Sequence, residues 1–230
     1  MKIGILQTGH CPDNLRPKYG DYDEFFKRFL VDRGFEFETY PVLDDILPLN
    51  INDADGWLVT GSKFGTYEDH KWIPPLEDFL RAAYQQAIPI VGICFGHQIL
   101  ARALGGKVEK FDGGWSIGVE NYALEGYPEG VNLIAWHQDQ VTELPEGATV
   151  IGSSPFCRYA ALAYGNRAFT IQPHPEFVAG FVAELIESRR SILPADIVDK
   201  AINSLSIETA SRQIADQIAE FFNKSMNQLT

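Results

Sequence analysis

Apolar residues in the first hundred positions of the chain follow two patterns. Short continuous runs indicate buried strands, whereas apolar positions that recur every three or four residues indicate helices. The runs predict strands over residues 2–7, 35–42, 55–60 and 88–93. The spaced positions predict helices over 21–33, from about 74, and after 94 as far as Gly105-Gly106. Strands that alternate with helices are typical of a mostly parallel sheet covered on both faces.

The pattern changes after Gly106. Turn residues, including Tyr127-Pro128, separate short β-like pieces over 107–111, 118–124, 132–136, 149–153, 159–164 and 168–172. Three amphipathic helices are expected over 177–192, 195–205 and 207–222, with the apolar stripes of the last two packed on the sheet. The predicted fold class is α/β, a mostly parallel sheet flanked by helices with a small antiparallel β addition.

Length and composition predict how the chain is organised. With 230 residues, 45% of them hydrophobic, the chain is long enough for one sizeable core and short for two. We therefore expect a single domain over residues 1–230, with a core in about 1–192 and C-terminal helices over about 195–223.

Charge and targeting signals restrict the partners. The 31 acidic residues outnumber the 19 basic ones, so a net charge of -12 repels phosphate backbones and anionic lipid. Nucleic acid and membranes are therefore not expected as partners. The N-terminus is typical of a first strand and not of a signal peptide, the apolar runs are too short to cross a membrane, and three cysteines form no disulfide framework. These features predict a cytoplasmic protein.

Cys94 lies where a buried strand turns into a helix. Gly92 and Gly96 flank it in the pattern Gly-x-Cys-x-Gly, a cysteine version of the nucleophile elbow in which small neighbours permit a sharp turn. The free N–H groups and the dipole of the following helix favour a thiolate and a developing oxyanion. The alternative is that Cys94 is a small buried hydrophobe, but the two glycines and the polar His97-Gln98 favour a nucleophile.

Two histidines are candidates for the base that serves Cys94. His174 directly follows an apolar strand, and Glu176 can accept its second ring proton, as in a Cys-His-acid triad. Glu176 could also be a charge at a helix N-terminus, and both roles can hold together. His137 is the rival base because Asp139 is close to it in sequence, whereas His97 is expected to be structural. Zinc is not expected, since no cysteine pair or His-Glu-x-x-His spacing is present.

Two motifs together resemble a known family. The segment Gly92-Ile93-Cys94-Phe95-Gly96-His97-Gln98 resembles the nucleophile motif of class I (triad-type) glutamine amidotransferases, and His174-Pro175-Glu176 follows about eighty residues later, as in that family. The resemblance extends from the first strand to about residue 190 and suggests a stand-alone version of the amidotransferase domain of GMP synthases, with a flavodoxin-like fold. It implies that Cys94 attacks the side-chain amide of glutamine, His174 protonates the departing ammonia, and Glu176 orients His174. A γ-glutamyl thioester would then be hydrolysed to glutamate.

The resemblance also implies the rest of the site. The oxyanion would be held by the N–H of Phe95 and by the Gly61-Ser62 turn, where relatives usually have Gly-Gly-Pro. Gln98 would help to hold the substrate. Trp115, Ser116 and Ile117 fall where relatives bind its α-amino and carboxylate groups, although Trp115 could equally be a packing aromatic. No cofactor and no metal are implied.

The fate of the ammonia leaves three hypotheses open. The chain has no phosphate-binding loop and no room for an ATP-dependent synthetase domain. Either ammonia passes to a separate synthase or synthetase partner, or the substrate is a γ-glutamyl compound, because stand-alone family members with a Gly-Ser turn resemble γ-glutamyl peptidases. The third hypothesis is a non-catalytic regulatory binding domain on the same scaffold, against which the intact Cys94, His174 and Glu176 argue.

Overall fold

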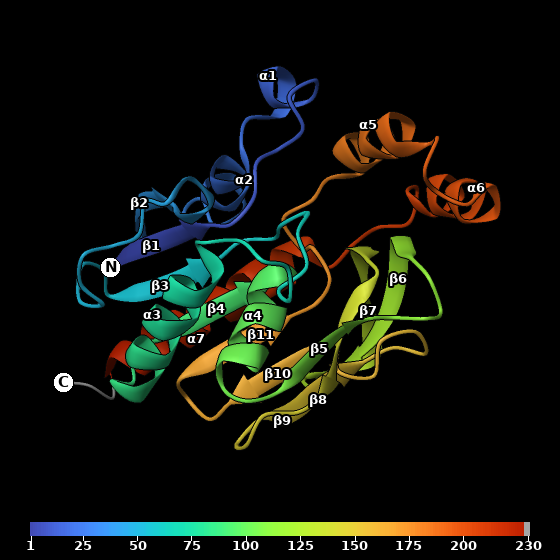
Figure 1. Ribbon diagram of the computed structural model, residues 1–230. Helices are drawn as coiled ribbons and strands as arrows, with labels where there is room; N and C mark the ends of the chain where they lie inside the picture. The colour runs from blue at the N-terminus through green and yellow to red at the C-terminus, as the bar shows by residue number, and fades with distance from the viewer. Residues whose placement is uncertain (228–230) are drawn as a thin grey trace.

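The computed structural model describes residues 1–227 and has an α/β fold (Figure 1). The strands are β1 (Lys2–Gln7), β2 (Glu36–Pro41), β3 (Gly56–Val59), β4 (Ile90–Ile93), β5 (Lys107–Lys110), β6 (Ser116–Leu124), β7 (Tyr127–His137), β8 (Asp139–Glu143), β9 (Thr149–Ser153), β10 (Ala161–Tyr164) and β11 (Ala168–Ile171). The helices are α1 (Arg16–Tyr19), α2 (Tyr22–Phe29), η1 (Val42–Asp44), α3 (Ile73–Gln85), α4 (Phe95–Ala103), α5 (Ala179–Arg189), α6 (Ala195–Ser204) and α7 (Ser211–Asn227).

One half of the central sheet is parallel. Its strand order is β2-β1-β3-β4-β11, and each neighbouring pair runs in the same direction. Every residue of β3, β4 and β11 is buried. Burial on both faces explains why these strands are continuous apolar runs in the sequence. The predicted α/β class is confirmed.

The other half of the sheet is antiparallel. Strands β10, β9, β6 and β7 continue the same sheet beyond β11, and β5 and β8 form a separate two-stranded sheet. This antiparallel part is larger than the small addition expected. The Tyr127-Pro128 pair begins strand β7, where a turn was expected, and β7 is the last strand of the sheet. Proline is tolerated on an edge strand because its missing N–H is not needed there.

The helices differ from the expected ones mainly at their ends. Helix α2 begins with a capping box between Asp21 and Glu24, but it ends at Phe29 and not near Arg33. Asp32 has a φ of 63°, which a right-handed helix does not allow. Helix α7 begins at Ser211, later than residue 207. The sequence patterns did not reveal the short α1 and η1 or strand β8.

Helices cover both faces of the sheet, with a core on each side. Helices α2 and α7 contribute Phe26, Ile214, Ile218 and Phe222 to one buried cluster, while α3 and α4 contribute to the other. The apolar stripe of α7 therefore packs in the core, as predicted. Helices α5 and α6 lie at one end of the molecule (Figure 1), where they pack in a third cluster with residues of β6 and β7.

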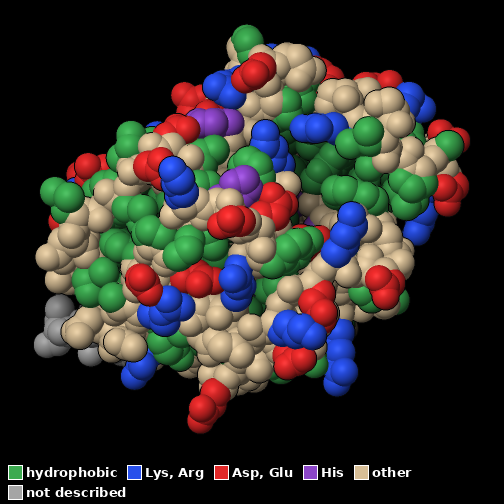
Figure 2. Space-filling view, in the orientation of Figure 1, with side chains coloured by type: hydrophobic (Ala, Val, Ile, Leu, Met, Phe, Trp, Pro, Cys, Tyr) green, Lys and Arg blue, Asp and Glu red, His purple; other side chains and the backbone are tan. Residues whose placement is uncertain are grey.

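Two expectations concern the chain as a whole. No helix within residues 1–227 is both long and apolar enough to cross a membrane. The expectation of a single domain over residues 1–230 stays a prediction, and its last three residues lie outside the described part of the chain. On the face drawn in Figure 2, acidic and basic side chains are interspersed.

Replacing Phe222 by alanine is expected to destabilise the protein by about 3–5 kcal/mol, because truncating a buried aromatic leaves a cavity. Phe222 is fully buried and its ring meets Phe35 edge to face at 5.8 Å. Urea unfolding followed by circular dichroism measures the loss. The control is Glu220→Ala on an exposed face of the same helix, which is expected to change stability by less than about 0.5 kcal/mol. Equal losses in the two variants would contradict the role of α7 in the core.

Candidate active site

The candidate site lies where three neighbouring strands end. Gly61-Ser62 follows β3 after one residue, Cys94 directly follows β4, and His174 follows β11 after two residues. Since β3, β4 and β11 are parallel neighbours, their carboxyl ends meet at one edge of the sheet. Ligands bind at this edge in open α/β sheets.

Cys94 has a strained backbone. Its φ is 53° and its ψ is -102°, and it is the N-cap of α4. Such a conformation costs roughly 1–3 kcal/mol and persists only where surrounding contacts enforce it. The Cys94 N–H donates to the carbonyl of Ile171 at 2.9 Å, so β11 helps to hold the turn.

The two glycines around Cys94 allow the backbones to approach closely. A Cβ atom at Gly92 would lie 2.5 Å from the carbonyl oxygen of Gly96. A Cβ atom at Gly96 would lie 2.4 Å from the carbonyl oxygen of Val59 on β3. No side chain fits at either position without moving backbone, which agrees with the elbow predicted from Gly-x-Cys-x-Gly.

The structure brings Cys94, His174 and Glu176 together. Nδ1 of His174 lies 2.7 Å from Oε1 of Glu176, and the two side chains are only 5% and 2% exposed. The Cys94 side chain acts on the His174 ring as well, since it is among the causes that raise the pKa of His174. Helix α5 begins at Ala179, three residues after Glu176. The Glu176 carboxylate is thus directed at His174 and does not cap the helix.

His174 is held in place from two further directions. The backbone N–H of His174 donates to the carbonyl of Ile134 at 2.7 Å, and this bond ties the loop that carries His174 to strand β7. Its ring stacks on Phe177 with a centroid distance of 4.1 Å and an interplanar angle of 8°. Phe177 itself meets Phe25 and Phe181 edge to face. A buried aromatic cluster therefore fixes the plane of the imidazole.

Electrostatics distinguish His174 from the other buried histidines. Burial alone would lower the pKa of His174, but the charges of Glu176 and Cys94 and its hydrogen bonds to both raise it to about 10. Burial lowers the pKa of His137 and of His97 to about 3 in each case. His174 is therefore an imidazolium at neutral pH, whereas the other two are neutral.

The rival base His137 has no carboxylate partner among the described residues. Its Nδ1 lies 3.3 Å from the backbone carbonyl of Asp139, and its buried Nε2 has no hydrogen-bond partner within residues 1–227. His97 is tied to Thr170 at 2.8 Å, in keeping with a structural role. No group of three or more His, Cys, Asp or Glu residues in the described part of the chain could hold a metal ion.

The Gly61-Ser62 turn lies against Cys94 and His174. A Cβ atom at Gly61 would lie 2.8 Å from Cε1 of His174 and 3.7 Å from Cβ of Cys94. The Gly61 carbonyl accepts hydrogen bonds from the hydroxyls of Thr8, at 3.2 Å, and Thr60, at 3.0 Å. Since the peptide is planar and trans, the Ser62 N–H points away from these threonines. The Phe95 N–H is at the first turn of α4.

The side chain of Gln98 is hydrogen-bonded to two other residues of the protein. Its Nε2 donates to the carbonyl of Asp139 at 2.8 Å and to Oε1 of Gln172 at 3.0 Å. Gln172 in turn directs its Nε2 at the sulfur of Cys94, 3.6 Å away. Gln98 is therefore linked to Cys94 through the side chain of Gln172.

The segment Trp115 to Ile117 lies at the start of β6, beside the end of β7. Ser116 and Ile117 are buried and pair across the ladder with His137 and Trp136. The Trp136 carbonyl oxygen lies 4.0 Å from the Cys94 sulfur, so this hairpin borders the nucleophile. Trp115 is half-buried and meets the ring of Trp136 edge to face at 6.5 Å.

Sequence reasoning missed four residues that contact the site. Thr8 and Gln172 are polar residues directly after strands β1 and β11, and this position was a signal that could have singled them out. Phe177 follows Glu176 directly and resembles any core aromatic in the sequence. Trp136 contributes a backbone carbonyl, for which no side-chain signal exists.

Comparisons with known proteins show which family the chain resembles. Residues 18–187 match the family described as glutamine amidotransferase class-I. Gamma-glutamyl peptidase 3 of Arabidopsis thaliana is 28% identical over 227 residues, which cover 91% of each chain. The glutamine-hydrolyzing GMP synthase of Ralstonia pickettii is 29% identical over 206 residues, covering 74% of this chain but 36% of that protein. The crystal structure of a glutamine amidotransferase from Methylobacillus flagellatus has the same fold, with a TM-score of 0.77 and 22% identity over 97% of this chain and 94% of that one.

Glu176→Gln is expected to lower the pKa of His174 by about one unit or more, because a neutral amide stabilises the imidazolium less than a carboxylate does. Titration of the His174 ring by NMR measures the shift. Glu68→Gln is the matched control, because Glu68 pairs with the half-exposed His70 away from the triad. It should leave the His174 titration unchanged. An unchanged His174 pKa in the Glu176 variant would contradict the electrostatic role of Glu176.

Proposed function

Because the chain belongs to the class I glutamine amidotransferase family, we propose that it hydrolyses γ-glutamyl amide bonds through a thioester on Cys94. Its proposed substrates are γ-glutamyl peptides. The observation that supports this proposal most is that the buried, hydrogen-bonded pair of His174 and Glu176 lies beside Cys94 within one chain, with the Gly61 turn against both His174 and Cys94. No partner subunit is needed to assemble this triad.

In the proposed reaction the Cys94 sulfur attacks the γ-glutamyl carbonyl carbon, and the carbonyl oxygen becomes an oxyanion. The N–H groups of Ser62 and Phe95 stabilise this charge, which is the largest single contribution in many acyl transfers. The His174 imidazolium gives its proton to the leaving nitrogen as the C–N bond breaks, and the thioester remains. Glu176 stabilises the charged form of His174 and fixes its orientation.

Water completes the reaction. His174, now neutral, takes a proton from a water molecule that attacks the thioester carbonyl. The C–S bond breaks, glutamate leaves, and the proton on His174 restores the starting pair with the Cys94 thiolate. We propose that Trp115, Ser116 and Ile117 form the wall against which the α-amino and carboxylate groups lie, and that Gln98 acts on the site through Gln172.

The comparisons support a peptidase for this chain. A relative that matches over 91% of both chains is named a γ-glutamyl peptidase, so the match extends over most of the length of each protein. In the GMP synthase, by contrast, the match covers 36% of the protein.

The second candidate is a glutaminase that supplies ammonia to a separate synthase or synthetase. The match to one part of a GMP synthase favours this alternative. Its chemistry at Cys94 is identical, and only the leaving group differs. The hypothesis of a non-catalytic binding domain requires that Cys94, His174 and Glu176 carry out no reaction.

Purified protein is expected to release glutamate from γ-glutamyl dipeptides with kcat/KM at least about tenfold above that for glutamine, about 1.4 kcal/mol in transition-state binding. A coupled glutamate dehydrogenase assay measures both substrates. Cys94→Ala should reduce the rate by about a thousandfold or more, because the nucleophile is lost. Cys157→Ala, which removes another buried cysteine, should keep most of the activity.

Three outcomes separate the candidates. A preference for glutamine would favour the ammonia-supplying enzyme. Release that survives in Cys94→Ala would contradict the proposed nucleophile. No release from either substrate by the intact protein would contradict a self-sufficient hydrolase.

A further inference from the structure

Phe177 lies face to face with the imidazole of His174. The two ring centroids are 4.1 Å apart and the ring planes differ by 8°. Both residues are buried, with 5% of Phe177 and 4% of His174 exposed. A cation within about 6 Å of an aromatic centroid is attracted by the negative face of the ring, most strongly where water is excluded. The contact therefore favours the charged form of His174 over the neutral form.

A single β-turn brings two different groups to His174. The N–H of Phe177 donates to the carbonyl of His174 at 3.4 Å, which makes Pro175 and Glu176 the corner residues of the turn. Proline suits the first corner because its φ is fixed. Glu176 meets the edge of the imidazole at Nδ1, whereas Phe177 meets its face. The other ring nitrogen, Nε2, is left for the reacting groups.

Aromatic neighbours hold the Phe177 ring in this position. Phe25 of α2 and Phe181 of α5 meet it edge to face, with centroids 5.9 and 4.9 Å away, and Tyr22 lies at 6.2 Å. In an edge-to-face contact the positive edge of one ring meets the negative face of another. Because a rotation of Phe177 would disrupt these three contacts, the surrounding core enforces the stacked arrangement with His174.

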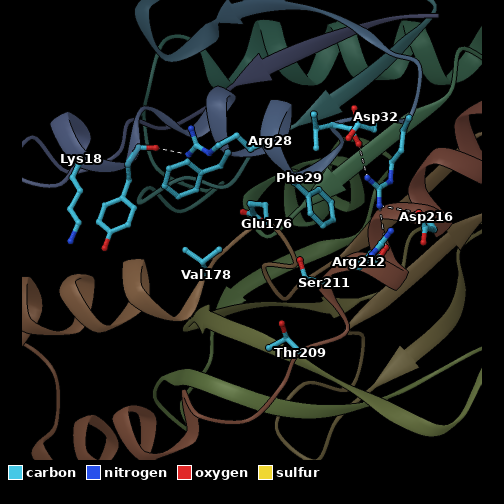
Figure 3. A pocket seen from close by; sticks show the side chains of 14 residues that line it. Lys18, Arg28, Phe29, Asp32, Glu176, Val178, Thr209, Ser211, Arg212 and Asp216 are labelled. Atoms are coloured by element: carbon cyan, nitrogen blue, oxygen red, sulfur yellow. Dashed lines mark hydrogen bonds and ion pairs between the residues drawn. The ribbon is translucent and has the colours of Figure 1, made fainter.

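The Phe177 ring faces away from the cavity beside it. This cavity, of about 860 Å³, is lined by the two chain neighbours of Phe177, Glu176 and Val178, and by Phe29 of α2 (Figure 3). Phe177 is absent from the described residues that line it. Its ring is directed into the protein instead, where it contacts His174. Any effect of Phe177 on a reaction is therefore exerted through His174.

We propose that Phe177 is a positioning residue of the proposed hydrolysis, whose ring stabilises the His174 imidazolium and keeps its Nε2 directed at the leaving nitrogen. Burial acts against the charged imidazole, and Glu176 opposes this effect from one edge of the ring. Phe177 opposes it from the face. The proposal rests on the proposed function in that His174 would be the acid, but the stacking contact does not depend on any substrate.

The effect of the ring face on the charge of His174 can be measured without substrate. NMR titration of the labelled His174 ring is expected to show its pKa lowered by about 0.5–1.5 pH units in Phe177→Leu, because the aromatic face is lost. Pentafluorophenylalanine at position 177 should lower the pKa at least as much, since fluorine withdraws electrons from the face of a ring of similar shape. Phe177→Tyr keeps an aromatic face and should retain the pKa.

The same replacements at Phe181 are the matched control. Phe181 is fully buried in the same aromatic cluster and contacts Phe177, but it makes no ring contact with His174 within residues 1–227. Phe181→Leu is expected to lose stability, as Phe177→Leu does, because each leaves a cavity in the core. The titration of His174 should stay unchanged in the Phe181 variants.

Kinetics separate positioning from a purely structural role. Phe177→Leu is expected to lower kcat for a γ-glutamyl dipeptide by about tenfold with KM within about twofold, because the residue contacts His174 and not the substrate. Phe177→Tyr should restore most of kcat. Phe181→Leu should keep kcat despite its lower stability.

Two results would overturn the proposal. One is a His174 pKa that is unchanged by both replacements of Phe177. The other is an equal change of that pKa in the Phe177 and Phe181 variants. If Phe177→Leu does not fold, the fluorinated protein, which keeps the ring, decides alone. Because the titration needs no turnover, a failure to release glutamate from any substrate would contradict the proposed function and leave this test intact.

Discussion

The positive φ of Cys94 is the constraint on which the site depends. The backbone can turn this sharply only because β4 is hydrogen-bonded between β3 and β11, and because Gly92 and Gly96 leave room for neighbouring carbonyls. The same two strands deliver the Gly61-Ser62 turn and His174 to either side of the sulfur. The strain at Cys94 is thus balanced by strands that are buried along their whole length, and a change in strand order would separate all three groups.

The sequence predicted this central part well and the periphery less well, for physical reasons. Strands β3, β4 and β11 are buried on both faces, so their apolar runs are unambiguous, and their order as parallel neighbours places Cys94 and His174 at one edge. Strand β8 contains Asp139, Gln140 and Thr142 and lies in a two-stranded sheet, so it has no such run. The position of Gln172 directly after β11 was a signal in the sequence, but its contact with Gln98, 74 positions away in the chain, became known only with the fold.

Three buried histidines show how local partners decide the charge of one side-chain type. Burial acts against the imidazolium in all three, but only His174 has a buried carboxylate that reverses the effect and raises its pKa. Its contribution to stability is complete below the ordinary pKa of about 6.5 and is lost as the pH rises through about 10. For His137 and His97, whose pKa is lowered to about 3, the sign is opposite: stability is lost as the pH falls from about 6.5 toward 3. Charged His174 and neutral His137 are therefore present together between about pH 3 and about pH 10.

Glu176 and the loop that carries it are held from two sides. Oε1 of Glu176 lies 2.7 Å from Nδ1 of His174 and stabilises the imidazolium. The loop that carries Glu176 is also held by Ser211 of α7 through the Pro175 carbonyl. The orientation of the His174 ring and the packing of α7 are therefore connected by one side chain and one hydrogen bond.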